Sequence, residues 1–154
     1  MRRIATLLVG LALPGCSGQG AHGVPMQPPM DMAHLIRPST PNTALAAPAG
    51  FSPAPDIVTR RYDLAPEALY ATLRRVAGRQ PRTFEQVAYD DRQQAHSVAR
   101  SMLMNFPDLI AMQVNSDSTL VLWSRSVYGR SDLGVNRRRL TAWLGALDTT
   151  LATH

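Results

Sequence analysis

The sequence predicts an α+β domain: an antiparallel sheet of about five strands with two helices packed on one face, in the order β-α-β-β-β-β-α. Apolar residues make up 45% of the 154-residue chain, which is enough for one hydrophobic core. Two segments, near residues 66–77 and 136–151, have the apolar period of amphipathic helices. Between them lie four segments typical of strands, at residues 83–89, 94–104, 109–114 and 119–126. Packing two helices on one face of these strands is the simplest arrangement.

The individual elements follow from local signals. Residues 57–62 alternate between apolar and polar side chains, which predicts the first strand. Pro66 suits the first turn of a helix, where its missing N–H costs nothing, and Gly78 favours the end of that helix. Residues 115–118 form a strong turn signal between two strands. Asn136 is expected to cap the last helix, whose apolar face consists of Leu140, Trp143, Leu144, Leu147 and Leu151.

The first fifteen residues have the pattern of a secretory signal peptide. Arg2 and Arg3 precede an apolar run at residues 4–13, which is about half as long as a membrane-spanning helix must be. The run ends in Leu-Pro-Gly-Cys, and this resembles the lipobox of bacterial lipoproteins, in which the cysteine receives a diacylglyceryl group. We therefore expect residues 1–15 to be removed and Cys16, the only cysteine of the chain, to carry a membrane lipid. The alternative is an ordinary signal peptide with an accidental cysteine.

The residue after the cysteine indicates where such a lipoprotein would reside. Ser17 follows the cysteine. Aspartate at this position would resemble the signal for retention in the inner membrane, whereas serine resembles the pattern sorted to the outer membrane. We expect a lipid-anchored protein of the bacterial cell envelope, in the outer membrane and facing the periplasm.

Residues 17–56 contain eight prolines and no apolar periodicity, which is typical of an extended linker. We expect residues 16–36 to form a lipidated flexible tether and residues 37–154 to form a single α+β domain. Histidines and methionines gather at residues 22–34, and such side chains can bind Cu(I). Their spacing is irregular, so we interpret them as part of the linker and expect neither a metal nor another cofactor.

The formal net charge of +5 is small, and the arginines are scattered, so a nucleic-acid partner is not expected. The run GRSDLGVNRRR at residues 129–139 is polar and compact. Its last three arginines occupy the first turn of the final helix, where the helix dipole disfavours positive charge. Either Asp132 compensates as a cap and ion-pair partner on a solvated basic face, or an anion binds to the helix N–H groups and guanidinium groups.

This run resembles the C-terminal signature of the family catalogued as domain of unknown function 1499. The motif RPSTPN at residues 37–42 and the motif FPD at residues 106–108 are similar to two further motifs of that family. The resemblance spans residues 37–147 and implies an envelope protein without an assigned activity. It also implies that residues 37–55 fold back onto the domain beside residues 132–136.

Two departures from the family pattern concern the implied site. The family usually has two arginines in the strand before the signature, and their positions correspond to Trp123 and Val127, so that Arg125 alone remains. A cysteine commonly follows the Pro-Asn pair, whereas Thr43 stands here. If those groups form a site in relatives, this chain lacks part of it.

The sequence contains no nucleophile elbow, phosphate loop or zinc-ligand spacing, so no catalytic residue is assigned. Three hypotheses stay open: a non-catalytic envelope module that binds a lipid, glycan or protein partner, an anion binder, and a hydrolase with an unrecognised site. A deep apolar cavity would favour the lipid. The candidate ligand- or anion-binding residues are Arg37, Asn42, Arg125, Arg130, Ser131, Asp132, Asn136 and Arg137.

Overall fold

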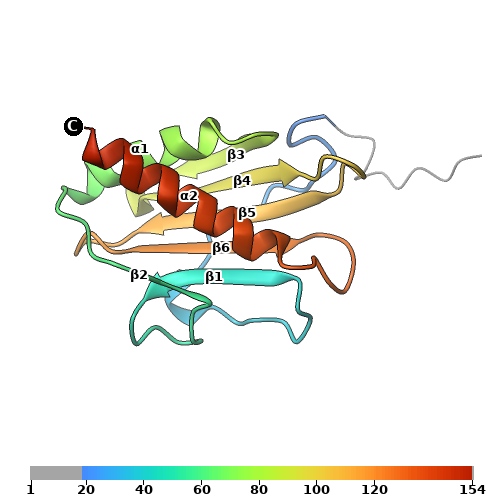
Figure 1. Cartoon of the computed structure of the whole chain (residues 1–154), viewed down its shortest axis with the longest axis horizontal. Helices are drawn as coiled ribbons and strands as arrows, with labels where there is room; N and C mark the ends of the chain where they lie inside the picture. Colours follow the sequence, from blue (N-terminus) through green and yellow to red (C-terminus); the bar gives the residue numbers. More distant parts are fainter. Residues whose placement is uncertain (1–18, 154) are drawn as a thin grey trace, which may run out of the picture.

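The structure is a computed structural model that describes residues 19–153, and Figure 1 shows its elements. Two short 3₁₀ turns, η1 (Met32–His34) and η2 (Asp90–Arg92), accompany the strands and helices. The helices are α1 (Pro66–Gly78) and α2 (Val135–Ala152). The strands are β1 (Thr43–Pro48), β2 (Ile57–Thr59), β3 (Thr83–Tyr89), β4 (Gln94–Arg100), β5 (Pro107–Val114) and β6 (Leu120–Ser126).

The six strands form one mixed sheet in the order β2-β1-β6-β5-β4-β3, and both helices pack on the same face of it (Figure 1). All neighbouring strands are antiparallel except β1 and β2, which are parallel. The α+β class is therefore confirmed. The expectation of about five strands in a purely antiparallel sheet is wrong, because β1 adds a strand and its pairing with β2 is parallel.

Strand β1 escaped prediction because it is buried on both faces. Ala44 and Ala46 belong to the core beneath the helices, whereas Leu45 and Ala47 belong to an apolar cluster on the opposite face. A strand that is covered on both sides has no alternation of apolar and polar residues. Such a segment, lying between prolines, has the composition of a linker although it occupies the interior of the sheet.

Both helices pack the apolar faces predicted from their periodicity against the core. Pro66 begins α1, and Leu69, Leu73 and Val76 are buried beneath it. In α2, Leu140, Trp143 and Leu147 are buried, while Leu144 and Leu151 are partly buried against the same core. Burying apolar side chains of this size stabilises the fold by about 1.5–3 kcal/mol each.

Two strands are shorter than expected. The strand predicted at residues 57–62 ends at Thr59, because the chain leaves the sheet edge there and Arg60 pairs with Asp148 of α2. The strand predicted at residues 94–104 ends at Arg100, because Ser101 N–H donates to the carbonyl oxygen of Phe106 and closes a hairpin loop.

The predicted cap of α2 is wrong. Gly134, with a φ of 77°, precedes the helix, and Asn136 lies inside it with a fully buried side chain. The capping oxygens come from Asp132, which accepts hydrogen bonds from the N–H groups of Gly134 and Asn136. The side-chain amide of Asn136 instead donates hydrogen bonds to Asn42, just before β1, and to Ser126 of β6.

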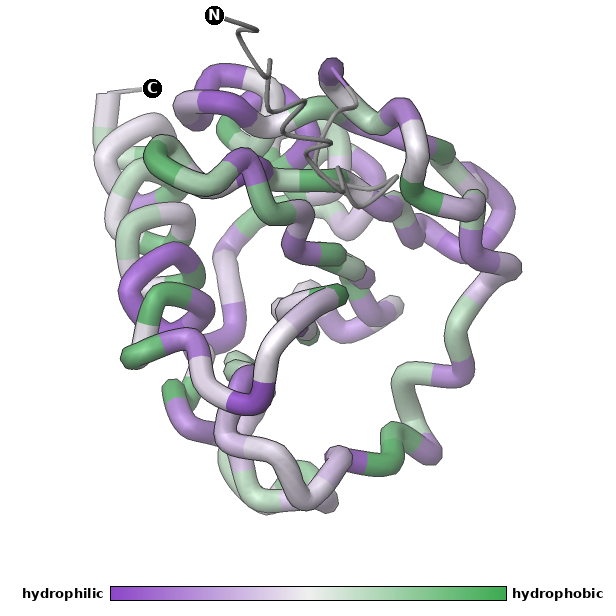
Figure 2. Tube along the Cα trace, turned by 90° about the vertical axis from the view of Figure 1, so that its right-hand side faces the viewer, coloured by the Kyte–Doolittle hydropathy of each residue, from purple (hydrophilic) through white to green (hydrophobic). Residues whose placement is uncertain are grey.

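The chain before β1 covers the sheet face that the helices leave open. In Figure 2 α2 runs down the left side, and this segment lies on the right, across the sheet. Val24, Met32 and Leu35 are buried in it. The described part of the predicted free tether, residues 19–36, is thus packed against the domain. The predicted signal peptide and Cys16 lie outside the described residues.

Side chains of the sheet hold this segment in place. The Gln94 side chain bonds to both the N–H and the carbonyl oxygen of Met30. Arg100 donates to the carbonyl oxygens of Gly20 and His22. These bonds satisfy backbone groups that no strand partner reaches, so composition alone could not reveal them. No helix among residues 19–153 is long and apolar enough to cross a membrane.

Candidate functional site

Two places in the fold bring candidate residues together, and the first is a polar cluster at the start of α2. The Asn136 side chain donates to the backbone carbonyl of Asn42 at 2.9 Å and to Ser126 Oγ at 3.1 Å. Its oxygen accepts from Ser124 Oγ and from Arg139 Nη1. One buried amide therefore ties the start of β1, the end of β6 and the first turn of α2 together.

The buried charges of this cluster have partners within it. Arg139 Nη2 lies 2.6 Å from Asp108 Oδ2, and both side chains are largely buried. Asp132 caps the helix, and its negative charge interacts favourably with the positive end of the helix dipole. Two carboxylates thus offset much of the positive charge expected in this turn, and Arg137 and Arg138 are exposed to solvent. An anion is not required to offset this charge, and the cluster has the character of a structural joint.

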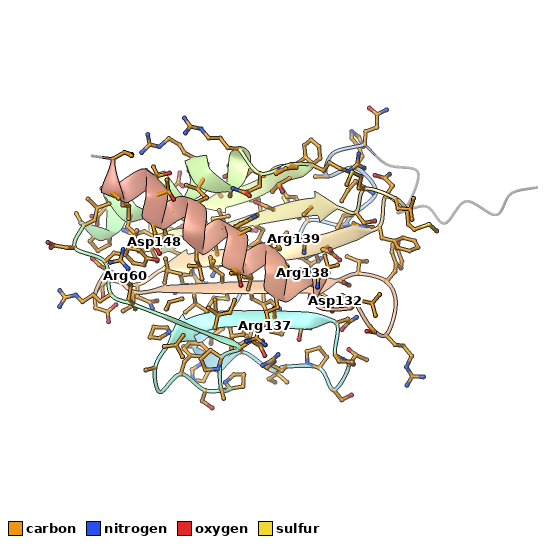
Figure 3. The ribbon with its side chains drawn as sticks, in the orientation of Figure 1. Arg60, Asp132, Arg137, Arg138, Arg139 and Asp148 are labelled. Carbon is orange, nitrogen blue, oxygen red and sulfur yellow. The ribbon has the colours of Figure 1, made fainter. Side chains whose placement is uncertain are left out.

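The remaining candidate residues lie in several places. Asn42 joins the cluster and donates to the carbonyl oxygen of Gly129 at 2.7 Å. Arg37 lies elsewhere, where it pairs with Asp56 at 2.8 Å and stacks over the Trp123 ring. Arg130, Ser131 and Arg137 are exposed. Figure 3 shows Asp132 and the arginines of α2 along the start of that helix, with no single point at which they all meet.

The second place is a cleft of about 590 Å³ between the N-terminal segment and the open face of the sheet. Its volume falls in the range of sites for small molecules. The wall consists of residues 27–38, and the floor consists of side chains from the three strands β4, β5 and β6. Sequence reasoning missed this cleft because it assigned its wall to a free tether.

Strand register explains which side chains form the floor. Leu109 of β5 lies opposite Arg125 of β6, and Ala111 lies between His96 of β4 and Trp123 of β6. Because side chains alternate between the faces of a strand, these five residues share the face away from the helices. The neighbours of Ala111 and Leu109 along β5, such as Ile110 and Met112, belong to the core beneath the helices.

Most of the wall of the cleft is apolar, and its prolines restrict the backbone. Pro28, Pro29 and Pro38 contribute to it, and proline has a fixed φ and no N–H group to satisfy. Leu35 is buried against Trp123, whereas Ile36 is 88% exposed at the cleft. The exposed surface of the wall is thus mostly apolar.

Arg125 is the charged side chain of the cleft floor. It is half-buried, and its guanidinium has no hydrogen-bond or ion-pair partner among residues 19–153. Asp31 and His34 of the wall are partners of each other, with His34 Nδ1 2.8 Å from Asp31 Oδ2. That hydrogen bond from His34 also lowers the pKa of the Asp31 carboxyl group. A partly buried cation without a counter-charge favours a negatively charged ligand.

His96 lies on the floor but has structural partners. It is 2% exposed, and burial lowers its pKa, so the ring is neutral at physiological pH. Its Nε2 lies 3.1 Å from Gln94 Oε1, and its ring meets the Tyr89 ring edge-on at 5.5 Å. The residues that line the cleft include no serine, threonine or cysteine that could act as a nucleophile.

These features define a small α+β domain with a ligand-sized, mostly apolar cleft on the face of the sheet opposite its helices. The chain belongs to the family described as "Protein of unknown function (DUF1499)", whose model matches residues 36–147. The suspected family is therefore confirmed. Among curated proteins, none matches this sequence. The family match begins at residue 36, so most of the cleft wall precedes it.

Proposed function

We propose that this protein is a bacterial envelope lipoprotein whose domain binds one amphiphilic molecule, consisting of an apolar chain and a carboxylate or phosphate head group. The single observation that carries the proposal is Arg125: a half-buried arginine whose guanidinium has no partner among residues 19–153, set in the floor of a mostly apolar cleft. The apolar walls account for the chain of the ligand, and Arg125 accounts for its charge.

The apolar part of the ligand supplies most of the binding energy of the proposed complex. Burial of each methylene group stabilises a complex by about 0.8 kcal/mol, which corresponds to roughly a fourfold change in affinity. Pro28, Pro38 and Ile36 offer exposed apolar surface for it along the wall. The nearly buried Leu109 and Trp123 form the floor beneath. A glycan would place its hydroxyl groups against these side chains without hydrogen-bond partners, so we favour an acyl chain over a sugar.

The head group determines the orientation of the ligand. A guanidinium binds a carboxylate or phosphate through two parallel N–H···O bonds, and such charge-assisted bonds are stronger than neutral ones. Arg125 lies beside Leu109 on the floor, so a head group bound there directs the chain toward Ala111 and Trp123.

The same lining argues for binding rather than hydrolysis. A hydrolase would need an activated nucleophile or water beside the head group. His96, the only other ionisable group of the floor, is held by Gln94 and kept neutral by burial. We therefore propose a binder without catalytic activity.

The first test removes the charge of Arg125 in the Cys16→Ser background, which lacks the predicted acylation site. Arg125→Ala should weaken binding of dodecanoate roughly ten- to hundredfold, because a hydrogen bond to a charged group contributes about 1.5–3 kcal/mol. Binding of uncharged dodecanol should change little. Calorimetric titration of both ligands measures the difference.

Arg130→Ala is the matched control, since Arg130 is an exposed arginine outside the cleft lining. Its affinity for dodecanoate should equal that of the parent chain. Equal losses of dodecanoate binding in Arg125→Ala and Arg130→Ala would contradict the proposed role of Arg125.

The envelope part of the proposal rests on the lipobox-like run that ends at Cys16. Metabolic labelling with a palmitate analogue should mark the wild-type chain and leave Cys16→Ser unlabelled. Cell fractionation should then place the labelled chain in the outer membrane. Equal label in both chains would contradict acylation of Cys16.

A further inference from the structure

The two ends of the sheet differ in charge. We call the end that holds residues 19–23, 79–84, 101–106 and 127–138 the basic end. The opposite end, with residues 60–67, 89–93, 115–119 and 148–153, is the acidic end. In Figure 1 the basic end is on the right, where the loop after β4 and the loop before α2 lie, and the C-terminus is on the left.

Contacts between side chains and neighbouring loops show that the segments of the basic end adjoin one another. The rings of Phe106 and Tyr128 lie 6.2 Å apart, which joins the β4–β5 loop to the loop before α2. Arg82 Nη2 donates to Asn105 Oδ1 and joins the β4–β5 loop to the turn before β3. Arg100 donates to the carbonyl oxygen of Gly20 at 2.7 Å, which places the start of the described chain at the same end.

The tip of the basic end is an exposed apolar loop. Met102 is 89% exposed, Leu103 is 92% exposed and Met104 is 57% exposed. This loop has a defined shape, because Ser101 and Phe106 exchange two hydrogen bonds of 2.9 Å across its base. Leu133, 84% exposed, adds an apolar side chain in the loop before α2. Adjacent large apolar side chains held in water are typical of a surface that contacts a membrane or a partner.

The basic end also carries exposed arginines and little negative charge. The basic end carries one carboxylate, Asp132, whose oxygens already cap α2. Its exposed arginines are Arg79, Arg82, Arg130, Arg137 and Arg138. The acidic end has the reverse balance, with three arginines and the six carboxylates Asp63, Glu67, Asp90, Asp91, Asp117 and Asp148.

The position of the chain's start completes the arrangement. Cys16 precedes Gly20 by four residues, which span at most about 14 Å when fully extended. A lipid on Cys16 would therefore hold the basic end, and not the acidic end, next to the bilayer. Basic groups near a membrane surface are attracted to anionic lipids, and apolar side chains beside them enter the interface.

We propose that the basic end docks on an anionic lipid bilayer, with Met102, Leu103 and Met104 in the interface and the arginines against the head groups. The partner is the membrane surface itself. The lipid anchor of the proposed function would add to this contact, but the docking surface is separate from the cleft, and binding in the cleft can fail without affecting it.

The test places a fluorescent probe at each end of the molecule. The full chain, as cells produce it, carries Leu103→Cys or Ser116→Cys and is labelled with an environment-sensitive dye. Ser116 is exposed in the turn between β5 and β6 at the acidic end, so it is the matched control. Each chain is reconstituted with vesicles of phosphatidylcholine and phosphatidylglycerol that contain a spin-labelled quencher lipid. Mass spectrometry first establishes whether Cys16 is acylated.

At position 103 we expect a blue-shifted emission and loss of most of the fluorescence to the quencher. At position 116 we expect neither. Vesicles of phosphatidylcholine alone should reduce the quenching at position 103. An unquenched probe at position 103, equal quenching at both positions, or equal quenching in both kinds of vesicle would overturn the proposal.

A chain with unacylated Cys16 would refute the anchor and still test the docking surface. In that case sedimentation with the anionic vesicles is compared between the parent chain and Leu103→Asp. Loss of sedimentation in Leu103→Asp supports docking. Absence of sedimentation in the parent chain, or equal sedimentation of both, overturns it.

Discussion

The two faces of the sheet are built from the same strands but closed in different ways. On one face, α1 and α2 cover a continuous core of aliphatic side chains around Trp143. On the other, residues 19–42 lie across the strands with one 3₁₀ turn and leave the cleft beside Trp123. The first face shows what stabilises the domain. The second shows where a ligand can bind without disturbing that core.

The largest effect on stability is expected when a buried side chain beneath the helices is truncated. Leu140→Ala should lower the free energy of unfolding by about 2–5 kcal/mol, because Leu140 is fully buried and its loss leaves a cavity. Urea denaturation measures this change. Under native conditions the variant should bind dodecanoate as the parent chain does. A loss of affinity equal to that of Arg125→Ala would mean that the two faces are not independent.

A smaller loss of stability is expected where β1, β6 and α2 meet. Asn136→Ala should lower the free energy of unfolding by about 1–3 kcal/mol, because Asn42, Ser124 and Ser126 each lose a hydrogen bond to the buried Asn136 side chain. Arg137→Ala, at an exposed neighbouring position, is the control and should change stability little. Ligand affinity unaffected by both variants would support a structural role for the cluster. An unchanged free energy of unfolding in Asn136→Ala would contradict that role.

The smallest effect concerns pH. Burial lowers the pKa of His96 below its usual value of 6.5, so the unfolded state binds this proton more readily than the folded state. The stability linked to His96 is therefore present above about pH 6.5 and is lost as the pH falls below it. Urea denaturation of the parent chain and of His96→Asn at pH 7.5 and 5.5 should show a smaller acid-induced loss in the variant. The same loss in both chains would show that His96 does not contribute to the acid-induced loss of stability.

The sequence predicts the helix-covered face far better than the open face. The periodicity of Leu69, Leu73 and Val76 locates α1, and that of Leu140, Trp143 and Leu147 locates α2, because a helix with one buried side repeats its apolar residues every three or four positions. These signals are local in the chain. They suffice for the fold class but not for the number of strands, since β1 is buried on both faces.

The open face depends on contacts between residues that are far apart in sequence. Gln94 holds Met30, and Arg100 holds Gly20, over separations that no local pattern reveals. Asparagine is a common helix cap, yet the hydrogen bonds of Asn136 to Asn42, just before β1, and to Ser126 of β6 hold it in the interior. Arg125 was a candidate from the family resemblance alone, and only the register of β5 and β6 places it in the cleft.

The most direct test of the central claim uses the two tryptophans as reporters of the two faces. Trp123 lines the cleft and Trp143 lies in the core beneath the helices. Brominated dodecanoate should quench the fluorescence of Trp143→Phe, in which Trp123 remains, with a saturating concentration dependence that Arg125→Ala weakens. It should leave Trp123→Phe unquenched. Equal quenching of both variants, or none in either, would contradict the proposal that the cleft binds the amphiphile.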